Sequence, residues 1–407
     1  MEVNLLHKNK TENIPNGYKK TIVGIIPKDW QVKKFKEITD ILKCGIASTP
    51  TYVEKGVPFL SSQNVKENKF ILDKYNYVSE EFHEKLTKNA KPQRGDILYT
   101  RVGANFGKAA VVDFDWEFSI YVSLTLIRMK QGYNNYFYSY LLNSDKYVYN
   151  ARRTVFQGGG VQNLNVKEVE KFDMVVPPYN EQEKIASILL TWDKAIELKE
   201  KLIEQKKKQK KGLMQKLLTG EVRLPGFDGE WKKVKLAKVV RKTKGKAVEY
   251  IEGGKFPAID MDYLESGTFK NYSNDATVFA EKNDVLLLWD GSRAGMAFTG
   301  VEGAVGSTFV KLECKSIHNI FLQKHFEMNE QRIQRLREGS GIPHVPKDFL
   351  DYYKVKMPSM EEQKAIAYVL NNMDRDLELL WKEVAYLKEQ KQGLMQLLLT
   401  GKVRVQV

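Results

Sequence analysis

The chain contains one long segment that occurs twice. Residues 177–223 reappear without gaps 181 residues later, as residues 358–404. Among the identical positions are Glu181, Asp193 and Gly212, which recur as Glu362, Asp374 and Gly393. A period this long does not fit a solenoid of short repeats. It indicates a duplicated half-molecule and predicts a pseudo-two-fold internal repeat.

Each copy of the repeated segment has the pattern of a long helix. Its apolar residues recur at alternating steps of four and three, which is the spacing of a coiled-coil seam. Pro177–Pro178 and Pro358 disfavour helix just upstream, and Thr219–Gly220 and Thr400–Gly401 provide C-terminal stops. A helix of about 38 residues is about 57 Å long at 1.5 Å per residue. The expected seam consists of Ile185, Leu189, Trp192, Ile196, Ile203, Leu213, Leu217, Ile366, Leu370, Met373, Leu377, Leu380, Val384, Leu387, Leu394 and Leu398.

The two helices are expected to pair with each other. One such helix cannot bury its apolar stripe alone, and the domain-sized connection between them permits an antiparallel coiled coil. The alternative is that each helix packs on its own domain. Lys210 and Lys391 occupy equivalent seam positions, so both seams are expected to loosen there. The lysine run at residues 206–211 is typical of a solvated helix face, with a contact to DNA or a partner subunit as the alternative.

The segments outside the helices predict two mixed domains of the α+β class, because short β-like runs alternate with Gly, Asn and Asp. The expected strands are Val57–Leu60, Asp96–Thr100, Ala109–Val112, Ser123–Arg128, Phe256–Ile259, Asp284–Leu288, Ala297–Thr299 and Ser307–Leu312. The expected organisation is an N-terminal arm at residues 1–20, a domain at 21–176, a helix at 177–220, a second domain at 221–356, and a helix with a tail at 357–407.

Charge and composition limit the function classes. The net charge of +14 favours a polyanionic partner such as DNA, with plain solubility charge as the alternative. No apolar run approaches the roughly 18 residues that cross a bilayer, and the N-terminus has no hydrophobic signal core, so a cytoplasmic location is expected. Neither the two cysteines nor the five histidines have metal-ligand spacing, so no metal site is predicted.

A Gly-x-x-x-Gly loop follows an expected strand in each half, at Gly103–Gly107 and Gly291–Gly295. A second glycine-containing segment, residues 158–160, corresponds to residues 339–341. Glycine lets a backbone approach a phosphate closely, although an ordinary turn is the alternative. Nearby side chains are of the types that pair with base edges and phosphates. The candidates are Ser61, Gln63, Asn64, Arg101, Asn105, Lys108, Arg152, Arg153 and Gln157 in the first half, and Ser292, Arg293, Arg337 and His344 in the second.

No catalytic site is predicted. The string Val176-Pro-Pro-Tyr179 approaches the Asn-Pro-Pro-Tyr motif of DNA amino-methyltransferases, but a valine side chain cannot accept a hydrogen bond from a target amine. Asp290, Glu313 and Lys315 could form a loose nuclease metal site, yet the first half lacks the equivalents. Neither a phosphate-binding loop nor a dinucleotide fingerprint occurs. A non-catalytic chain is therefore expected, with a metal-dependent nuclease as the minor alternative.

In this order and in duplicate, the motifs resemble those of the specificity (S) subunit of type I restriction–modification systems. Those that carry the resemblance across nearly the whole chain are Trp30–Phe35, Pro58–Val65, Gly95–Leu98, Gly306–Thr308, and the paired helix starts and ends. The resemblance implies two target-recognition domains, each reading one half of a bipartite asymmetric site in double-stranded DNA. It also implies that the antiparallel coiled coil sets the spacing between the half-sites.

The resemblance further implies partners. Two methylation (M) subunits would dock beside the helices, and restriction/motor (R) subunits would join them. S-adenosylmethionine, ATP and Mg are expected on those subunits, and no cofactor is expected in this chain. The alternative function is a coiled-coil assembly scaffold with degenerate recognition domains.

Overall fold

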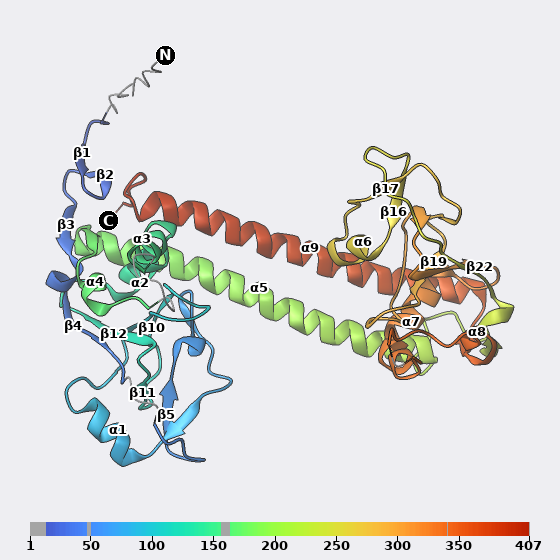
Figure 1. Ribbon diagram of the computed structural model, residues 1–407, viewed down its shortest axis with the longest axis horizontal. Coiled ribbons are helices and arrows are strands. Elements are labelled where there is room, and N and C mark those ends of the chain that lie inside the picture. Colours follow the sequence, from blue (N-terminus) through green and yellow to red (C-terminus); the bar gives the residue numbers. More distant parts are fainter. Residues whose placement is uncertain (1–13, 47–49, 156–162, 340, 407) are drawn as a thin grey trace. The chain divides into compact units, whose positions relative to one another are not determined.

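The computed structural model describes residues 14–46, 50–155, 163–339 and 341–406 (Figure 1). The chain divides into two compact units. Unit 1 comprises Met1–Glu197 with Ala385–Val407, and unit 2 comprises Leu198–Val384. The long helices α5 (Tyr179–Thr219) and α9 (Met360–Leu398) contribute residues to both units.

Unit 1 is built on an antiparallel sheet in the order β10–β9–β12–β4. Its strands are β4 (Thr39–Cys44), β9 (Ile97–Thr100), β10 (Ala109–Val111) and β12 (Leu124–Met129). Because side chains alternate along a strand, Leu98 and Leu126 pack on one side of this sheet and Ile97 and Ile127 on the other. The first side packs with residues of a second sheet, β11–β5–β8, formed by β5 (Val57–Leu60), β8 (Asn76–Val78) and β11 (Ser119–Ile120).

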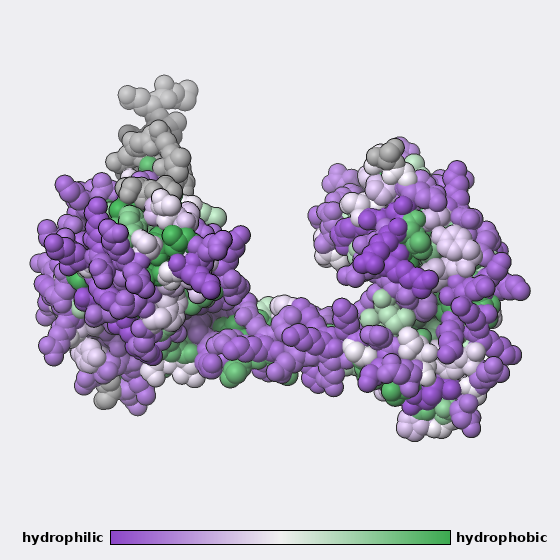
Figure 2. All heavy atoms as spheres, turned by 90° about the horizontal axis from the view of Figure 1, so that it is seen from below, coloured by the Kyte–Doolittle hydropathy of each residue, from purple (hydrophilic) through white to green (hydrophobic). Residues whose placement is uncertain are grey.

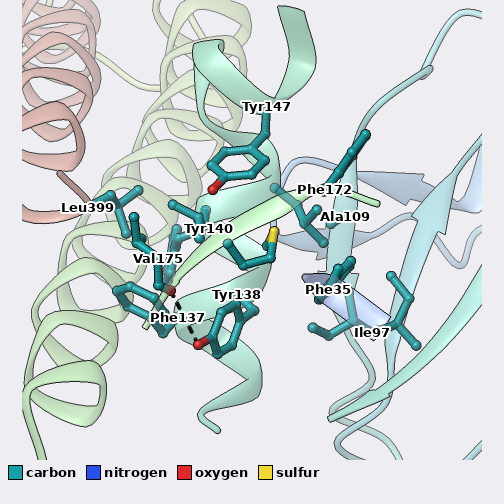
Figure 3. Close-up of a cluster of buried hydrophobic side chains, with 14 of the residues drawn as sticks. Phe35, Ile97, Ala109, Phe137, Tyr138, Tyr140, Tyr147, Phe172, Val175 and Leu399 are labelled. Atoms are coloured by element: carbon teal, nitrogen blue, oxygen red, sulfur yellow. Dashed lines mark hydrogen bonds between the residues drawn. The ribbon is translucent and has the colours of Figure 1, made fainter. Parts of the chain in front are cut away.

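The other side of the four-stranded sheet packs on helices and forms the larger core of unit 1 (Figure 3). Phe137, Tyr138 and Tyr140 of α2 and Tyr147 of α3 are buried there, and Leu399 joins them from the chain just beyond α9. The remaining elements of unit 1 are β1 (Tyr18–Thr21), β2 (Gly24–Pro27), β3 (Gln31–Lys34), β6 (Val65–Lys66), β7 (Lys69–Phe70), β13 (Asp173–Val176), α1 (Glu80–Thr87), α2 (Asn135–Asn143), α3 (Asp145–Val155) and α4 (Val166–Glu170), with the short 3-10 helices η1 (Phe35–Ile38) and η2 (Ser62–Asn64).

Unit 2 follows the same plan. Its four-stranded antiparallel sheet has the order β15–β22–β19–β20, a second sheet has the order β17–β16–β21–β18, and β14 pairs with β23. The strands are β14 (Lys232–Lys235), β15 (Val240–Lys244), β16 (Phe256–Ile259), β17 (Tyr272–Ser273), β18 (Phe279–Ala280), β19 (Val285–Leu288), β20 (Ala297–Thr299), β21 (Gly303–Val305), β22 (Phe309–Cys314) and β23 (Lys354–Met357). The helices are η3 (Leu236–Lys238), α6 (Met261–Ser266), α7 (Asn319–Arg335) and α8 (Phe349–Tyr352).

The strands expected from the sequence are confirmed, with shifts of one or two residues at several starts and ends, of which two starts are instructive. The run expected from Ser123 forms β12 from Leu124, and the run expected from Ser307 forms β22 from Phe309. In both cases the first strand residue closes a turn, since Leu124 N–H donates to the Tyr121 carbonyl and Phe309 N–H to the Gly306 carbonyl. The turn takes up residues that propensity alone assigns to the strand.

Within each unit, one stretch of α5 runs antiparallel to one stretch of α9. In unit 1, Glu181 pairs with Arg404 at 2.7 Å, and further along α5, Asp193 pairs with Lys391 at 2.6 Å. In unit 2, Lys210 pairs with Asp374. Beyond the end of α5, Arg223 pairs with Glu362 at 2.6 Å. Every residue of the expected seam is buried or half-buried.

These ion pairs are reciprocal between the two copies of the repeat. Glu181 and Glu362 are equivalent positions, and so are their partners Arg404 and Arg223. The same holds for Asp193 with Lys391 and Asp374 with Lys210. Each acid therefore binds the base contributed by the other copy. The two seam lysines do not loosen the seam as expected, because each is neutralised by a carboxylate on the opposite helix.

The Glu–Gln pair that occurs at the start of both long helices has the same structural role in each copy. The Gln182 side chain donates to the Pro177 carbonyl at 2.8 Å and accepts from the backbone N–H of Asn134 at 2.9 Å. Gln363 makes the same two bonds, to the Pro358 carbonyl at 3.0 Å and from the N–H of His318 at 2.9 Å. Asn134 and His318 are the N-caps of α2 and α7. Each glutamine thus joins its long helix to its own domain.

Mild acid should destabilise unit 2 through His325. Burial lowers the pKa of His325 to about 4, from an ordinary value of 6.5. The folded state therefore favours the neutral ring, and its stabilising contribution is present above pH 6.5 and is lost as the pH falls toward 4. We expect about 2 kcal/mol of this contribution to be lost between pH 6.5 and 5, at about 1.36 kcal/mol per pH unit. Urea unfolding of the wild type and of H325Q across this range measures it, and an unchanged pH slope in H325Q would contradict the assignment.

Candidate nucleic-acid interface

The two Gly-x-x-x-Gly loops are tight turns between antiparallel strands. The first joins β9 to β10 and the second joins β19 to β20. Gly103 and Gly107 have φ of 89° and 76°, and Gly291 and Gly295 have φ of 111° and 106°. These positive angles favour glycine in each loop because a Cβ atom would be strained. Turn geometry therefore accounts for the four glycines, and recognition depends on the side chains beside them.

In each unit, a second loop is brought against the Gly-x-x-x-Gly loop. Val102 forms a β-bridge with Asn163 in unit 1, and Asp290 forms one with His344 in unit 2. Asn163 and His344 are 181 residues apart, the same separation as the repeat. The predicted correspondence of the two loop pairs is therefore present on the described residues. Gln157 and the glycine-containing segment at residues 158–160 lie outside the described part of the chain.

The candidates of unit 2 gather at this junction. His344 exchanges backbone hydrogen bonds with Glu338, and the Arg337 guanidinium donates to the carbonyl of Ser292. Arg337 also donates to the Gln334 carbonyl at 2.7 Å. Arg293 is exposed, and its Nε donates to the Met296 sulfur at 3.1 Å. Ser292 and Arg293 are exposed, and the half-buried Arg337 is held by two backbone carbonyls.

Two candidate DNA-binding residues of unit 1 instead use their side chains for hydrogen bonds within the protein. The Arg101 side chain is buried and donates to the carbonyls of Leu164 at 2.6 Å and Val122 at 3.3 Å, and to Asn163 Oδ1 at 3.0 Å. Asn64 is buried as well, and its amide donates to the carbonyls of Ile71 and Lys74. Both side chains hold loops in place. Neither presents a free hydrogen-bonding group to a base in this conformation.

Truncation of Arg101 should therefore act on stability before it acts on sequence preference. R101A leaves the Leu164 and Val122 carbonyls and the Asn163 amide oxygen without a donor, which should cost about 2–3 kcal/mol. R152A removes an exposed arginine and should stay within about 0.5 kcal/mol of the wild type. Chemical denaturation of the two variants provides the comparison. Equal stabilities would show that the buried arginine network contributes nothing.

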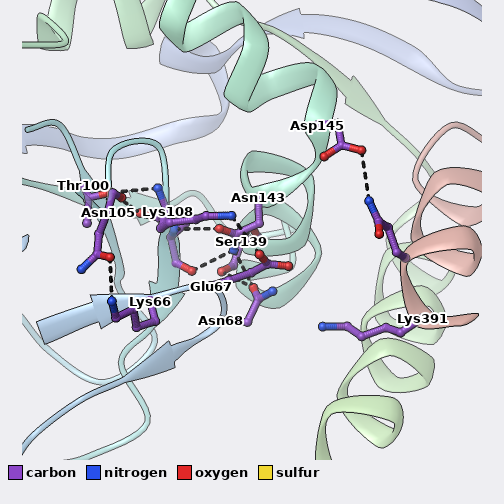
Figure 4. A network of polar contacts seen from close by, with 12 residues as sticks. Lys66, Glu67, Asn68, Thr100, Asn105, Lys108, Ser139, Asn143, Asp145 and Lys391 are labelled. Carbon is purple, nitrogen blue, oxygen red and sulfur yellow. Dashed lines mark hydrogen bonds and ion pairs between the residues drawn. The ribbon is translucent and has the colours of Figure 1, made fainter. Parts of the chain in front are cut away.

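The remaining candidates of unit 1 form an accessible polar surface around the Gly103–Gly107 loop. Asn105 Oδ1 accepts from Lys66 Nζ at 2.8 Å, and Lys108 pairs with Glu67 at 2.8 Å (Figure 4). The Asn105 amide also donates to the Ser62 carbonyl at 2.9 Å, which brings η2 to the loop. Ser61 is the N-cap of η2, and Gln63 is exposed on it. Lys66 belongs to this surface but escaped sequence reasoning, because nothing in its local pattern marks it.

Arg152 and Arg153 lie on the last turn of α3 and are exposed. Neither forms an ion pair with another described residue.

In unit 2, two lysines of β15 that the sequence did not predict also lie near the loop. Lys242 Nζ lies 3.9 Å from the centre of the Trp289 ring, and Lys244 pairs with Asp290. The alternation of basic residues along this strand is the signal that could have revealed them. Figure 2 shows hydrophilic side chains over most of the visible face of each unit.

Acidic residues of both units are engaged in ion pairs: Glu67 pairs with Lys108, Asp290 pairs with Lys244, and Glu313, at the other end of β22, pairs with two bases. Glu313 pairs with Lys315 at 3.1 Å and with Arg241, and Lys315 foremost holds the pKa of Glu313 below its ordinary value. Among the described residues, no group of three or more His, Cys, Asp or Glu side chains is placed to hold a metal ion. In the same part of the chain, no helix is long and apolar enough to cross a membrane. The surfaces around the two loops offer hydrogen-bond donors and positive charge.

Comparison with known proteins agrees with this architecture. A Methanocaldococcus jannaschii protein assigned as the MjaX type I restriction enzyme specificity subunit is 28% identical, over 98% of this chain and 99% of its own length. The MjaVIII specificity subunit of the same organism is 32% identical over 42% of each chain.

Solved structures share the fold at low sequence identity. The type I restriction–modification S subunit from M. genitalium superposes with a TM-score of 0.59 at 17% identity, covering 95% of this chain and 97% of that one. A chain from a structure on complex assembly and conformational transition of the type I R-M system gives a TM-score of 0.61 at 17% identity, covering 93% and 99%. The family model for the type I restriction modification DNA specificity domain matches twice, at residues 27–207 and 228–388. The chain therefore belongs to the type I restriction–modification DNA specificity family and carries two copies of its domain.

Proposed function

We propose that this chain is the non-catalytic subunit that gives a type I restriction–modification complex its DNA sequence specificity. Unit 1 reads one half of a bipartite, asymmetric site and unit 2 reads the other. Reading uses hydrogen bonds to base edges in the grooves, while lysine and arginine contacts to phosphates set position and affinity. The methylation and cleavage chemistry resides on partner subunits.

The single observation that carries this proposal is a shared scaffold with different side chains at equivalent loops. Both units place a Gly-x-x-x-Gly turn against a second loop, through bridges at Asn163 and His344. Around the turn, unit 1 presents Asn105 and Lys108, whereas unit 2 presents Ser292 and Arg293. Two units that share a fold but present different loop side chains are suited to a DNA site whose two halves differ in sequence.

The helices α5 and α9 are proposed to set the distance between the half-sites. A helix of 41 residues is about 60 Å long at 1.5 Å per residue. Half-sites on successive turns of a duplex lie about 34–36 Å apart, so a spacer of this length suits one to two turns. The outer faces of these helices are the proposed docking surface for two methylation subunits, with restriction/motor subunits joining them.

Binding measurements test the proposal. The chain alone is expected to bind duplex DNA weakly and with little sequence preference. Together with its methylation subunits, it should bind a bipartite target tightly, with log K falling linearly as log salt rises. A complex that binds without salt dependence, or that shows no preference for any target, would overturn the assignment. A salt slope with no preference would instead fit an assembly scaffold whose recognition domains are degenerate.

A further inference from the structure

The two-stranded ribbon β14–β23 of unit 2 presents four lysines on one face. Val234 and Val355 point into the core of unit 2, so the alternate residues of both strands face outward. These are Lys233 and Lys235 on β14 and Lys354 and Lys356 on β23, and all four are exposed. The register places Lys233 directly opposite Lys356 and Lys235 directly opposite Lys354. These four residues are called the lysine face.

The described residues around the lysine face provide almost no neutralisation of its positive charge. Lys233, Lys235 and Lys354 form no ion pair and no side-chain hydrogen bond with any described residue. Lys356 Nζ lies 3.5 Å from the Thr219 carbonyl at the end of α5 and 5.7 Å from the centre of the Trp231 ring. No carboxylate of the described residues lies within ion-pair distance of the four ammonium groups. The face is thus a concentrated positive charge open to solvent.

The duplicated chain supplies an internal comparison. In unit 1 the equivalent ribbon, β3–β13, pairs in the same register. Val32 lies opposite Val175 where unit 2 has Lys233 and Lys356, and Val175 is buried. Lys34 lies opposite Asp173 where unit 2 has Lys235 and Lys354, and the two form an ion pair of 2.7 Å. In unit 1, the two equivalent cross-strand positions of the ribbon are therefore occupied by an apolar pair and an ion pair.

Folding does not account for the lysines of unit 2. Side chains directly opposite in an antiparallel ladder are about 5 Å apart at Cβ, and like charges there oppose pairing. A single lysine per strand, or lysine opposite an acid as in unit 1, would protect the ribbon edges from aggregation equally well. Two opposed lysine pairs stabilise the folded protein only when a bound anion neutralises them.

We propose that the lysine face binds the phosphate backbone of duplex DNA. This inference rests on the proposed function, because it extends the DNA contact of unit 2 beyond its recognition loops. Protein interfaces are depleted in lysine and centre on aromatic and apolar side chains, and the face has no such centre. Lysine side chains on a solvated surface are instead the usual contacts to phosphates, and they position a protein without reading sequence.

The test measures the salt dependence of binding to a duplex of random sequence. The full-length variants are K233Q/K356Q and K235Q/K354Q, and K85Q/K88Q is the control, which removes the same charge from two exposed lysines at α1. Each lost phosphate contact lowers the slope of log K against log salt by about 0.9, so each pair variant should lower it by up to about 1.8. The control should leave the slope unchanged. Thermal unfolding should show the pair variants at least as stable as the wild type, since a repulsion has been removed.

Each other outcome overturns the inference. Slopes equal to the wild type in both pair variants would mean that the face does not touch DNA. If such variants also failed to co-elute with their methylation subunit, the face would be a docking site for an acidic protein surface. An equal loss of slope in the control would reduce the effect to net charge. Failure of the proposed function is a separate result: the wild-type complex would show no sequence preference. The salt slopes of the lysine variants do not affect that measurement.

Discussion

Replacing Asp374 with asparagine is expected to destabilise unit 2 by about 3–5 kcal/mol. Asp374 on α9 forms ion pairs with both Lys210 of α5 and Lys324 of α7, and both lysine side chains are largely buried. Among the described residues, the other carboxylate of this ring is Glu327, which pairs with the same two lysines. Without Asp374, two enclosed ammonium groups share one carboxylate, and an enclosed charge without a partner is costly.

The titration of the ring agrees with this assignment. Burial alone would lower the pKa of Lys210, but the carboxylates of Asp374 and Glu327 raise it overall. Burial alone would likewise raise the pKa of Glu327, and the two lysines lower it instead. The ring therefore favours the charged forms of Lys210 and Glu327.

The repeat provides a matched control in Asp193, which is equivalent to Asp374. Asp193 pairs with the single lysine Lys391 and accepts from the Tyr140 hydroxyl at 2.6 Å. D193N removes one ion pair where D374N removes two, so we expect a smaller loss of about 1–3 kcal/mol, confined to unit 1. Urea unfolding monitored by hydrogen exchange separates the units. Equal losses from D374N and D193N would contradict the account of the ring.

Replacing Trp30 with alanine is expected to cost about 4–5 kcal/mol. The Trp30 side chain has no exposed area, and its indole N–H donates to Glu181 Oε2 at 2.9 Å. Glu181 is itself buried and pairs with Arg404. The variant therefore leaves a large cavity and removes one donor from an enclosed carboxylate at the point where β3, α5 and the C-terminal segment meet.

Trp231 is the equivalent residue of unit 2 and serves as the comparison. It is half-buried, its indole N–H has no hydrogen-bond partner among the described residues, and the Arg223 guanidinium lies 5.6 Å from its ring. We expect W231A to cost about 2–3 kcal/mol, because less apolar contact is lost. Thermal and urea unfolding of both variants test the difference. A W231A loss as large as that of W30A would contradict the role assigned to the Trp30–Glu181 bond.

Sequence patterns predicted the strands and long helices of this protein, because these elements depend on the periodicity of apolar residues. The strands follow from β-branched and aromatic runs between turn residues, and the expected seam falls on positions that are buried or half-buried. The seam lysines were misinterpreted, because a one-dimensional pattern does not show that Asp193 and Asp374 lie across the helix pair from them. The heptad pattern of one helix shows a polar residue at an apolar position, but it does not show the oppositely charged partner on the other helix.

The candidate site was harder to predict, for a physical reason. Arg101 and Asn64 have the side chains of base readers, but local packing turns them onto backbone carbonyls. Lys66 and Lys242 reach the loop surfaces from other strands, so the sequence near the loops does not mark them. Residue type states what a side chain can bind, and only the fold decides which partner it meets first.

Exchange of the first recognition domain tests the central claim most directly. Residues 21–176 would be replaced by the corresponding domain of a related specificity subunit, and DNA from cells carrying the complete system would be profiled for methylation. The account predicts that the first half of the methylated site changes, while the second half and the spacing stay the same. An unchanged site, or a change in both halves, would contradict the claim that each unit reads its own half-site.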